Sequence, residues 1–132
     1  MFLGEYFSTL QQGVLSLPWS LDGTDRLFWI LFPEGRRPIL RLTPVSGCEA
    51  HSPEADEEGR NILASGCLPV LHDSRIELPP EFLSTLEPSE PLALLGILQS
   101  FEIWPADLWH EKSVQLNSHF FTDLLPDLLD PF

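Results

Sequence analysis

The stretch Leu71-His72-Asp73-Ser74-Arg75-Ile76-Glu77-Leu78-Pro79 combines a polar turn, a short alternating run and a closing proline. Ile76 and Leu78 alternate with Arg75 and Glu77, and this pattern predicts a strand that buries one face. The earlier stretch Leu10-Gln11-Gln12-Gly13-Val14-Leu15-Ser16-Leu17-Pro18 has the same layout. Its first leucine and its closing proline precede their counterparts by the same offset in residue number (71 − 10 = 61 and 79 − 18 = 61). We therefore expect the same local structure at both places.

A second pair of segments repeats at the same offset. Leu40-Arg41-Leu42-Thr43-Pro44 precedes Phe101-Glu102-Ile103-Trp104-Pro105 by 101 − 40 = 61. A fixed offset at separated places indicates an internal duplication. We expect a single domain over residues 1–112, made of two repeats at about 1–45 and 60–112. An acidic connector (46–59) joins the repeats, and an acidic, apolar C-terminal arm (113–132) follows them.

Periodicity and turn residues predict a mainly β protein with short helices, an α+β class. In the second repeat, alternation along the segment 101–104 places Phe101 and Ile103 in the interior and Glu102 in water. The expected strands are 3–8, 14–17, 26–32, 38–43, 75–78, 92–98 and 101–104. The expected helical segments are 60–65, 80–84 and a helix that begins near 105.

The charge balance limits the kinds of partner. The chain of 132 residues has 20 acidic and 7 basic residues, for a net charge of −13. A nucleic-acid binder normally presents a basic face, because the neutralisation of phosphates supplies most of its affinity. Four of the basic residues, Arg26, Arg36, Arg37 and Arg41, fall around the hairpin expected at 26–43. Two interpretations stay open for them, a solvated turn and a binding patch.

Composition also predicts a location. The chain has no apolar run of the roughly 18 residues that a membrane span needs, and its first residues lack the basic region and apolar core of a signal peptide. Two cysteines are too few for a disulfide scaffold. We expect a cytoplasmic protein without a membrane partner.

Residues suited to metal binding or catalysis are sparse. Cys48 with His51 and Cys67 with His72 are zinc-compatible ligand types, but their spacing is looser than that of zinc sites. Unrelated thiols and surface histidines are the plainer interpretation. No feature marks either cysteine as an activated nucleophile, and the chain has no phosphate-binding glycine loop. We therefore expect no enzyme activity, no cofactor and no metal.

The C-terminal arm carries a helix-like spacing of apolar residues at Phe121, Leu124, Leu125 and Leu128, interrupted by Pro126. Such an arm is expected to dock. Its own body, a second copy of the chain and a foreign partner are the alternatives.

In combination, several segments resemble the MraZ family. They are Met1–Tyr6, Arg60–Gly66, Arg75–Pro79 and Phe101–Trp104 with Trp109 after it, in the family's order and approximate spacing over residues 1–112. The resemblance implies an AbrB-like swapped-hairpin β-barrel built of two repeats. It also implies a bacterial, cytoplasmic or nucleoid-associated transcriptional regulator that binds DNA of division and cell-wall genes as a homo-oligomeric ring.

The chain departs from the family at the turn of each repeat, where members carry an acidic residue and a Gly-Arg pair that serves DNA contact. Val14 stands where the first arginine belongs, and Ser74 replaces the second glycine. Only Arg75 carries over as a DNA contact, to which the hairpin adds Arg36, Arg37 and Arg41 as candidates. The alternative is a relative that has lost DNA binding, acts through protein contacts and assembles with an ordinary family member.

Overall fold

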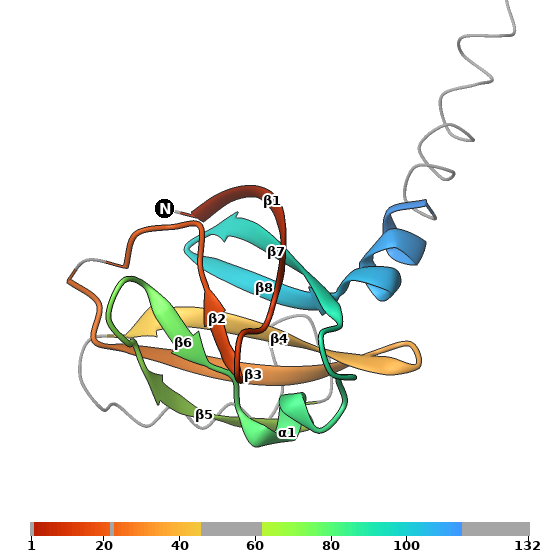
Figure 1. Ribbon diagram of the computed structural model, residues 1–132, viewed down its shortest axis with the longest axis horizontal. Coiled ribbons are helices and arrows are strands. Elements are labelled where there is room, and N and C mark those ends of the chain that lie inside the picture. Colours follow the sequence, from red (N-terminus) through yellow and green to blue (C-terminus); the bar gives the residue numbers. More distant parts are fainter. Residues whose placement is uncertain (1, 22, 46–61, 115–132) are drawn as a thin grey trace, which may run out of the picture.

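The computed structural model describes residues 2–21, 23–45 and 62–114. Six strands form one antiparallel sheet in the order β1-β7-β8-β4-β3-β5, and two short strands, β2 and β6, form a separate ribbon in front of it (Figure 1). The strands are β1 (Phe2–Thr9), β2 (Val14–Ser16), β3 (Arg26–Glu34), β4 (Arg37–Val45), β5 (Ala64–Pro69), β6 (Arg75–Glu77), β7 (Pro91–Leu98) and β8 (Ser100–Pro105). The helices are α1 (Pro80–Leu83) and a C-terminal helix that includes residues 106–114.

The strand order reads the same from both edges when β1–β4 and β5–β8 are treated as equivalent sets. The hairpins β3–β4 and β7–β8 meet at the centre through β4 and β8, while β1 pairs with β7 and β5 pairs with β3. The first strand of each half therefore pairs with the hairpin of the other half. β1 and β5 form opposite edges of the sheet, so these six strands are arranged as an open sheet.

The offset between the two repeats recurs in the strand pairing. Leu15 pairs with Ile76 at the middle of the ribbon, and Arg41 pairs with Glu102 at the middle of the main sheet. Both pairs join positions that differ by the repeat offset (76 − 15 = 61 and 102 − 41 = 61). The two halves thus meet each other at equivalent residues.

The larger core fills the space between the main sheet and the ribbon. Leu15 and Ile76, which face inward from the ribbon, are fully buried, as the alternation predicts. Helix α1 closes one end of this core. It begins with Pro80, whose missing N–H costs nothing at a first helical position, and it buries Phe82 completely.

A smaller core lies on the opposite face of the sheet, beneath the C-terminal helix. It contains Phe32, Ile39, Ala93, Leu95, Trp104 and Leu108. The central strands are therefore covered on both faces, and this corrects one prediction. Phe101 and Ile103 are fully buried as expected, but Glu102 is only 7% exposed and does not face water.

The predicted helical segment at 60–65 is wrong where the structure describes it. Ala64 and Ser65 belong to β5 and pair with Leu31 and Ile30 of β3. Pairing with a strand far away in the chain outweighs the weak local helix preference. The other predicted strands and helices agree with the observed ones to within a few residues. The connector and the arm beyond residue 114 lie outside the described residues.

Edge strand β1 leaves no room for a side chain at one position of β7. A Cβ on Gly96 would lie 2.4 Å from the backbone nitrogen of Leu3, so only glycine fits there. Its partner across the ladder, Gly4, has a φ of +101°, which a residue with a side chain rarely adopts. The two glycines allow β1 to curve over the end of the sheet, as Figure 1 shows.

Candidate nucleic-acid interface

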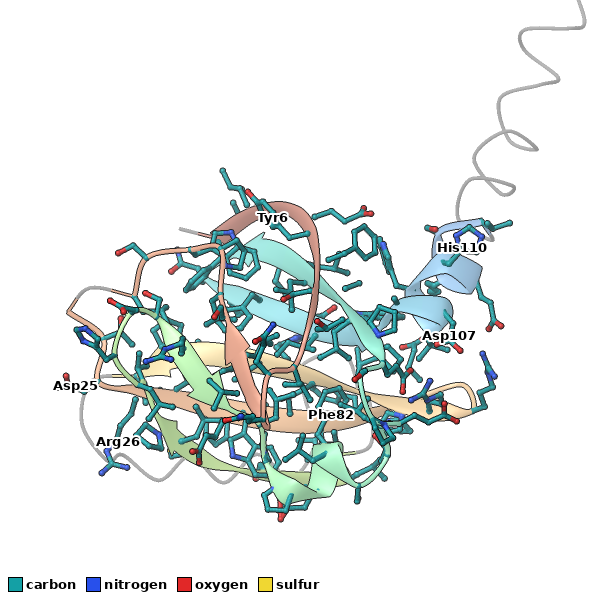
Figure 2. The ribbon with its side chains drawn as sticks, in the orientation of Figure 1. Tyr6, Asp25, Arg26, Phe82, Asp107 and His110 are labelled. Atoms are coloured by element: carbon teal, nitrogen blue, oxygen red, sulfur yellow. The ribbon has the colours of Figure 1, made fainter. Side chains whose placement is uncertain are left out.

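The predicted basic patch at the β3–β4 hairpin is divided in the structure. Arg36 and Arg37 lie at the turn between the strands, whereas Arg26 begins β3 at the far end. Figure 2 shows Arg26 at the opposite end of the molecule from Asp107 and His110 of the C-terminal helix. Arg26 therefore does not share a surface with Arg36 and Arg37, although all three belong to the same hairpin.

The Arg36 side chain bridges the hairpin turn to the C-terminal helix. Its Nη2 lies 3.3 Å from Asp107 Oδ2 and 2.9 Å from Glu111 Oε1. On the same helix, Lys112 Nζ lies 3.4 Å from Glu34 Oε1 of β3. These cations face carboxylates of this same chain and pair the helix with the hairpin.

Arg37 forms the strongest group of polar contacts in this region. Its guanidinium donates to both carboxylate oxygens of Glu90, at 2.5 and 2.7 Å, and to the carbonyl oxygen of Thr85 at 2.9 Å. It also lies 3.2 Å from Asp107. The hydrogen bond from Arg37 lowers the pKa of Glu90, and the hydrogen bond to Glu90 raises the pKa of Arg37. The contacts hold the hairpin against the segment that leads into β7.

Arg41 lies on a central strand of the sheet, and its side chain is mostly buried. Its Nη2 is 2.9 Å from Glu102 Oε2, and its guanidinium lies 5.1 Å from the centre of the Phe32 ring. The indole Nε1 of Trp104 donates to the other Glu102 oxygen at 3.0 Å. The burial of Glu102 is thus explained, because its charge is paired and both of its oxygens accept hydrogen bonds.

Arg75 differs from the hairpin cations because it projects from the ribbon into solvent. It pairs with Ser16 across the ribbon, while the other end pair is Val14 with Glu77. Its Nε donates to the carbonyl oxygen of His72 at 3.0 Å, which fixes the side chain on its own turn. The rest of its guanidinium can reach a ligand.

The two turns that lead into the ribbon have similar backbones. Gln12 and Gly13 have positive φ in the first turn, and the equivalent residues of the second turn, Asp73 and Ser74, also have positive φ. The first turn closes through Gln11 and Val14, which exchange two hydrogen bonds. The second closes one residue earlier, through Leu71 N and Arg75 O, so its loop is longer by one residue.

A groove beside Arg75 is lined mostly by neutral polar side chains. Its lining residues are Ser8, Thr9, Leu10, Gln11, Gln12, Val14, Ser16 and Arg75. Hydroxyl and amide groups donate hydrogen bonds to phosphate and sugar oxygens in protein–DNA complexes, and arginine donates in a planar fork. The groove therefore has the chemistry to hold an anionic, oxygen-rich ligand such as one phosphate of a nucleic-acid backbone.

Two acidic residues lie close to Arg75 in the chain. Glu77 lies on the outer face of the ribbon, and Asp73 lies on the turn, 3.3 Å from His72 Nε2. The second turn and β6 together carry these two carboxylates and the single cation of Arg75. A single chain offers weak electrostatic attraction to DNA at this place.

Among the six basic residues that the structure describes, four make ion pairs with carboxylates of the same chain: Arg36, Arg37, Arg41 and Lys112. Their partners are Glu34, Glu90, Glu102, Asp107 and Glu111, of which the sequence patterns singled out Glu102 alone, as a residue facing water. The excess of 20 acidic over 7 basic residues was the available signal, because it favours the pairing of each cation within the chain. Of the four predicted DNA contacts, Arg36, Arg37 and Arg41 each face a carboxylate of this chain, whereas the hydrogen bond of the Arg75 side chain goes to the backbone of its own turn.

Two of the four zinc-compatible residues fall within the described residues. Cys67 is exposed on β5, and His72 is exposed on the second turn, while Cys48 and His51 lie outside the described residues. Within residues 2–21, 23–45 and 62–114, no three His, Cys, Asp or Glu side chains are grouped so that they could hold a metal ion. In the same residues, no helix is long and apolar enough to cross a membrane.

No protein-family model matches this chain, and no curated protein matches it either.

Proposed function

We propose that this chain is a divergent MraZ-like transcriptional regulator that binds DNA of division and cell-wall genes as an oligomer. Its sheet would be a variant of the AbrB-type swapped-hairpin barrel. The exchange of first strands between the two halves supports this assignment, because β1 pairs with β7 and β5 with β3. The pairing of β2 with β6 at equivalent central residues, Leu15 and Ile76, supports it further.

The ribbon formed by β2 and β6 is the surface that faces DNA in this proposal. The observation that carries it is the exposed Arg75 beside a groove of hydroxyl and amide groups. Arg36, Arg37 and Arg41 are left out of the DNA-contacting surface, because each faces a carboxylate of this chain. Neutral donors then make most of the phosphate contacts.

One arginine per chain cannot supply the affinity of a typical regulator. Assembly of several chains presents several ribbons at once, and linked sites raise the effective concentration of each next contact. Affinity should therefore depend on the intact oligomer and fall steeply with salt, in proportion to the phosphates contacted.

Fluorescence anisotropy with the organism's own division-cluster promoter tests the proposal, from low to physiological salt. Arg75→Ala should weaken binding about tenfold or more, since a hydrogen bond to a charged group contributes about 1.5–3 kcal/mol. Arg26→Ala is the matched control, because Arg26 is also exposed but lies at the start of β3. It should change binding much less. An intact oligomer that does not bind this DNA at low salt would reject the proposal.

A second function is favoured by the ion pairs. Four of the six described basic residues are already neutralised within the chain, which suits a protein that acts through protein contacts and not through DNA. Such a protein would assemble with an ordinary MraZ family member. The masses of the two proteins measured alone and mixed would distinguish mixed assemblies from separate ones, and separate assemblies would reject this alternative.

A further inference from the structure

An apolar surface at one edge of the main sheet has no cover within the described residues. It consists of Leu3 and Phe7 of β1 and Ile97 of β7, which are 54%, 59% and 41% exposed. Leu3 pairs with Ile97, and Phe7 pairs with Ala93, so all of these side chains lie on one face of the sheet. We call this surface the uncovered apolar face.

The uncovered apolar face continues directly from the smaller core. Ala93 and Leu95 of β7 lie on the same face and are 0% and 9% exposed, in a cluster that includes Leu108 of the C-terminal helix. The helix therefore covers the middle of this face and leaves its β1 end open. Contiguous exposed apolar residues usually mark a surface on which another segment or molecule packs.

We propose that residues 115–132 of the same chain dock on the uncovered apolar face. This segment contains seven large apolar side chains in its last thirteen positions: Phe120, Phe121, Leu124, Leu125, Leu128, Leu129 and Phe132. The segment 46–61 is a poor occupant, because its sequence SGCEAHSPEADEEGRN holds no large aliphatic or aromatic residue.

The segment also starts close enough to reach. Phe7 is paired with Ala93, and Ala93 shares a cluster with Leu108 at the beginning of the helix. Six further helical residues advance about 9 Å to residue 114. The six residues 115–120 span up to roughly 20 Å when extended. Phe120 and the residues after it can therefore return to Phe7 and Leu3.

Charge neither attracts the segment to this face nor keeps it in place. The segment contributes Asp123, Asp127 and Asp130, and Glu5 lies on the same face of β1 as Leu3 and Phe7. Neither β1 nor β7 contains a basic residue. The contact is consequently hydrophobic, with the aspartates in solvent, and raising the salt concentration should not weaken it.

A double-mutant cycle in the full chain tests this contact. Phe7→Ser changes the sheet, Leu124→Ser with Leu125→Ser changes the segment, and a third protein carries all three substitutions. If the segment packs on Phe7, each of the first two proteins melts several degrees below the wild type. The combined protein then melts no lower than the less stable of the two, because the same contact is lost only once.

A matched control uses Leu63→Ser. Leu63 is 57% exposed, like Phe7, but precedes β5 at the opposite edge of the sheet. Its effect should add to that of the changes in the segment. Additive effects of Phe7→Ser and the changes in the segment would overturn the proposal. If Phe7→Ser does not fold, Leu3→Ser takes its place in the cycle.

The protein concentration separates the same chain from a second copy. Docking within one chain gives the same coupling at about 1 µM and about 100 µM, whereas docking between copies strengthens with concentration. Coupling that grows with concentration would overturn the intramolecular proposal and identify a second copy as the occupant. Equal coupling at both concentrations, retained at high salt, is the expected result.

Discussion

Two arginines of β4, Arg37 and Arg41, and the ribbon arginine, Arg75, occupy opposite environments. Arg37 and Arg41 lie 19% and 22% exposed and pair with the nearly buried carboxylates of Glu90 and Glu102. Arg75 projects from a two-stranded ribbon and contacts the backbone of its own turn. In a chain with this acidic excess, the position of a cation in the fold decides whether it stabilises the protein or can bind a partner.

The pairing of positions at the repeat offset explains part of this difference. Equivalent residues of the two halves meet at the centre of the sheet, and there the equivalents are Arg41 and Glu102, which have opposite charges. In the ribbon, the position equivalent to Arg75 is Val14, which cannot form an ion pair. Substitutions that exchange or remove these cations therefore test the comparison directly.

The largest effect is expected at the centre of the sheet. Arg41→Met should lower the free energy of unfolding by about 3–5 kcal/mol, because Glu102 would remain buried without a charged partner. Urea unfolding measures the loss. Adding Glu102→Gln should recover part of it, since the unpaired charge is then removed. A loss below about 1 kcal/mol would show that the pair does not stabilise the sheet.

A smaller effect is expected at the hairpin turn. Arg37→Ala should lower the free energy of unfolding by about 1–3 kcal/mol, because Glu90 and the Thr85 carbonyl lose their donor. Arg36→Ala is the control, since its ion pairs are more than half exposed and screened by solvent. Its loss should stay below about 1 kcal/mol. Equal losses for the two variants would contradict the distinction between them.

The pH dependence of stability should reveal the Arg37–Glu90 pair. The pKa of Glu90 is lowered from its ordinary value of 4.5 in the folded protein. As the pH falls, Glu90 is therefore protonated in the unfolded chain before it is protonated in the folded protein. The contribution of the Arg37–Glu90 pair to stability is full above pH 4.5 and is lost as the pH falls through the lowered pKa of Glu90. The stability difference between wild type and Arg37→Gln should shrink below pH 4.5. A stability difference that does not change with pH would show that the Arg37–Glu90 pair does not contribute to the pH dependence.

The smallest effect on stability is expected at the ribbon. Arg75→Ala should change the free energy of unfolding by less than about 0.5 kcal/mol, because the side chain is exposed and, within the described residues, its hydrogen bond goes to its own turn. Thermal melting at neutral pH measures this. A marked loss of stability would mean that Arg75 supports the fold and that its effect on DNA binding cannot be attributed to contact.

The sequence by itself determined most of the strands and the relation between the two halves. Strand side chains alternate with a period of two, so the pattern Arg75-Ile76-Glu77-Leu78 could only bury Ile76 and Leu78 together. The constant offset between the repeats also anticipated the equivalence of Leu15 and Ile76, which pair in the ribbon. These features are local or repeated in the chain, and the sequence alone can therefore reveal them.

Only the tertiary structure decided which polar residues are buried and which cations are available. Glu102 alternates like a surface residue, but β8 lies in the middle of a sheet covered on both faces, so its carboxylate pairs with Arg41. The strand at Ala64–Pro69 exists because β3, far earlier in the chain, offers it a partner. Ion pairs and strand pairing join residues that are distant in sequence, and their energies depend on distance and burial, which the sequence does not contain.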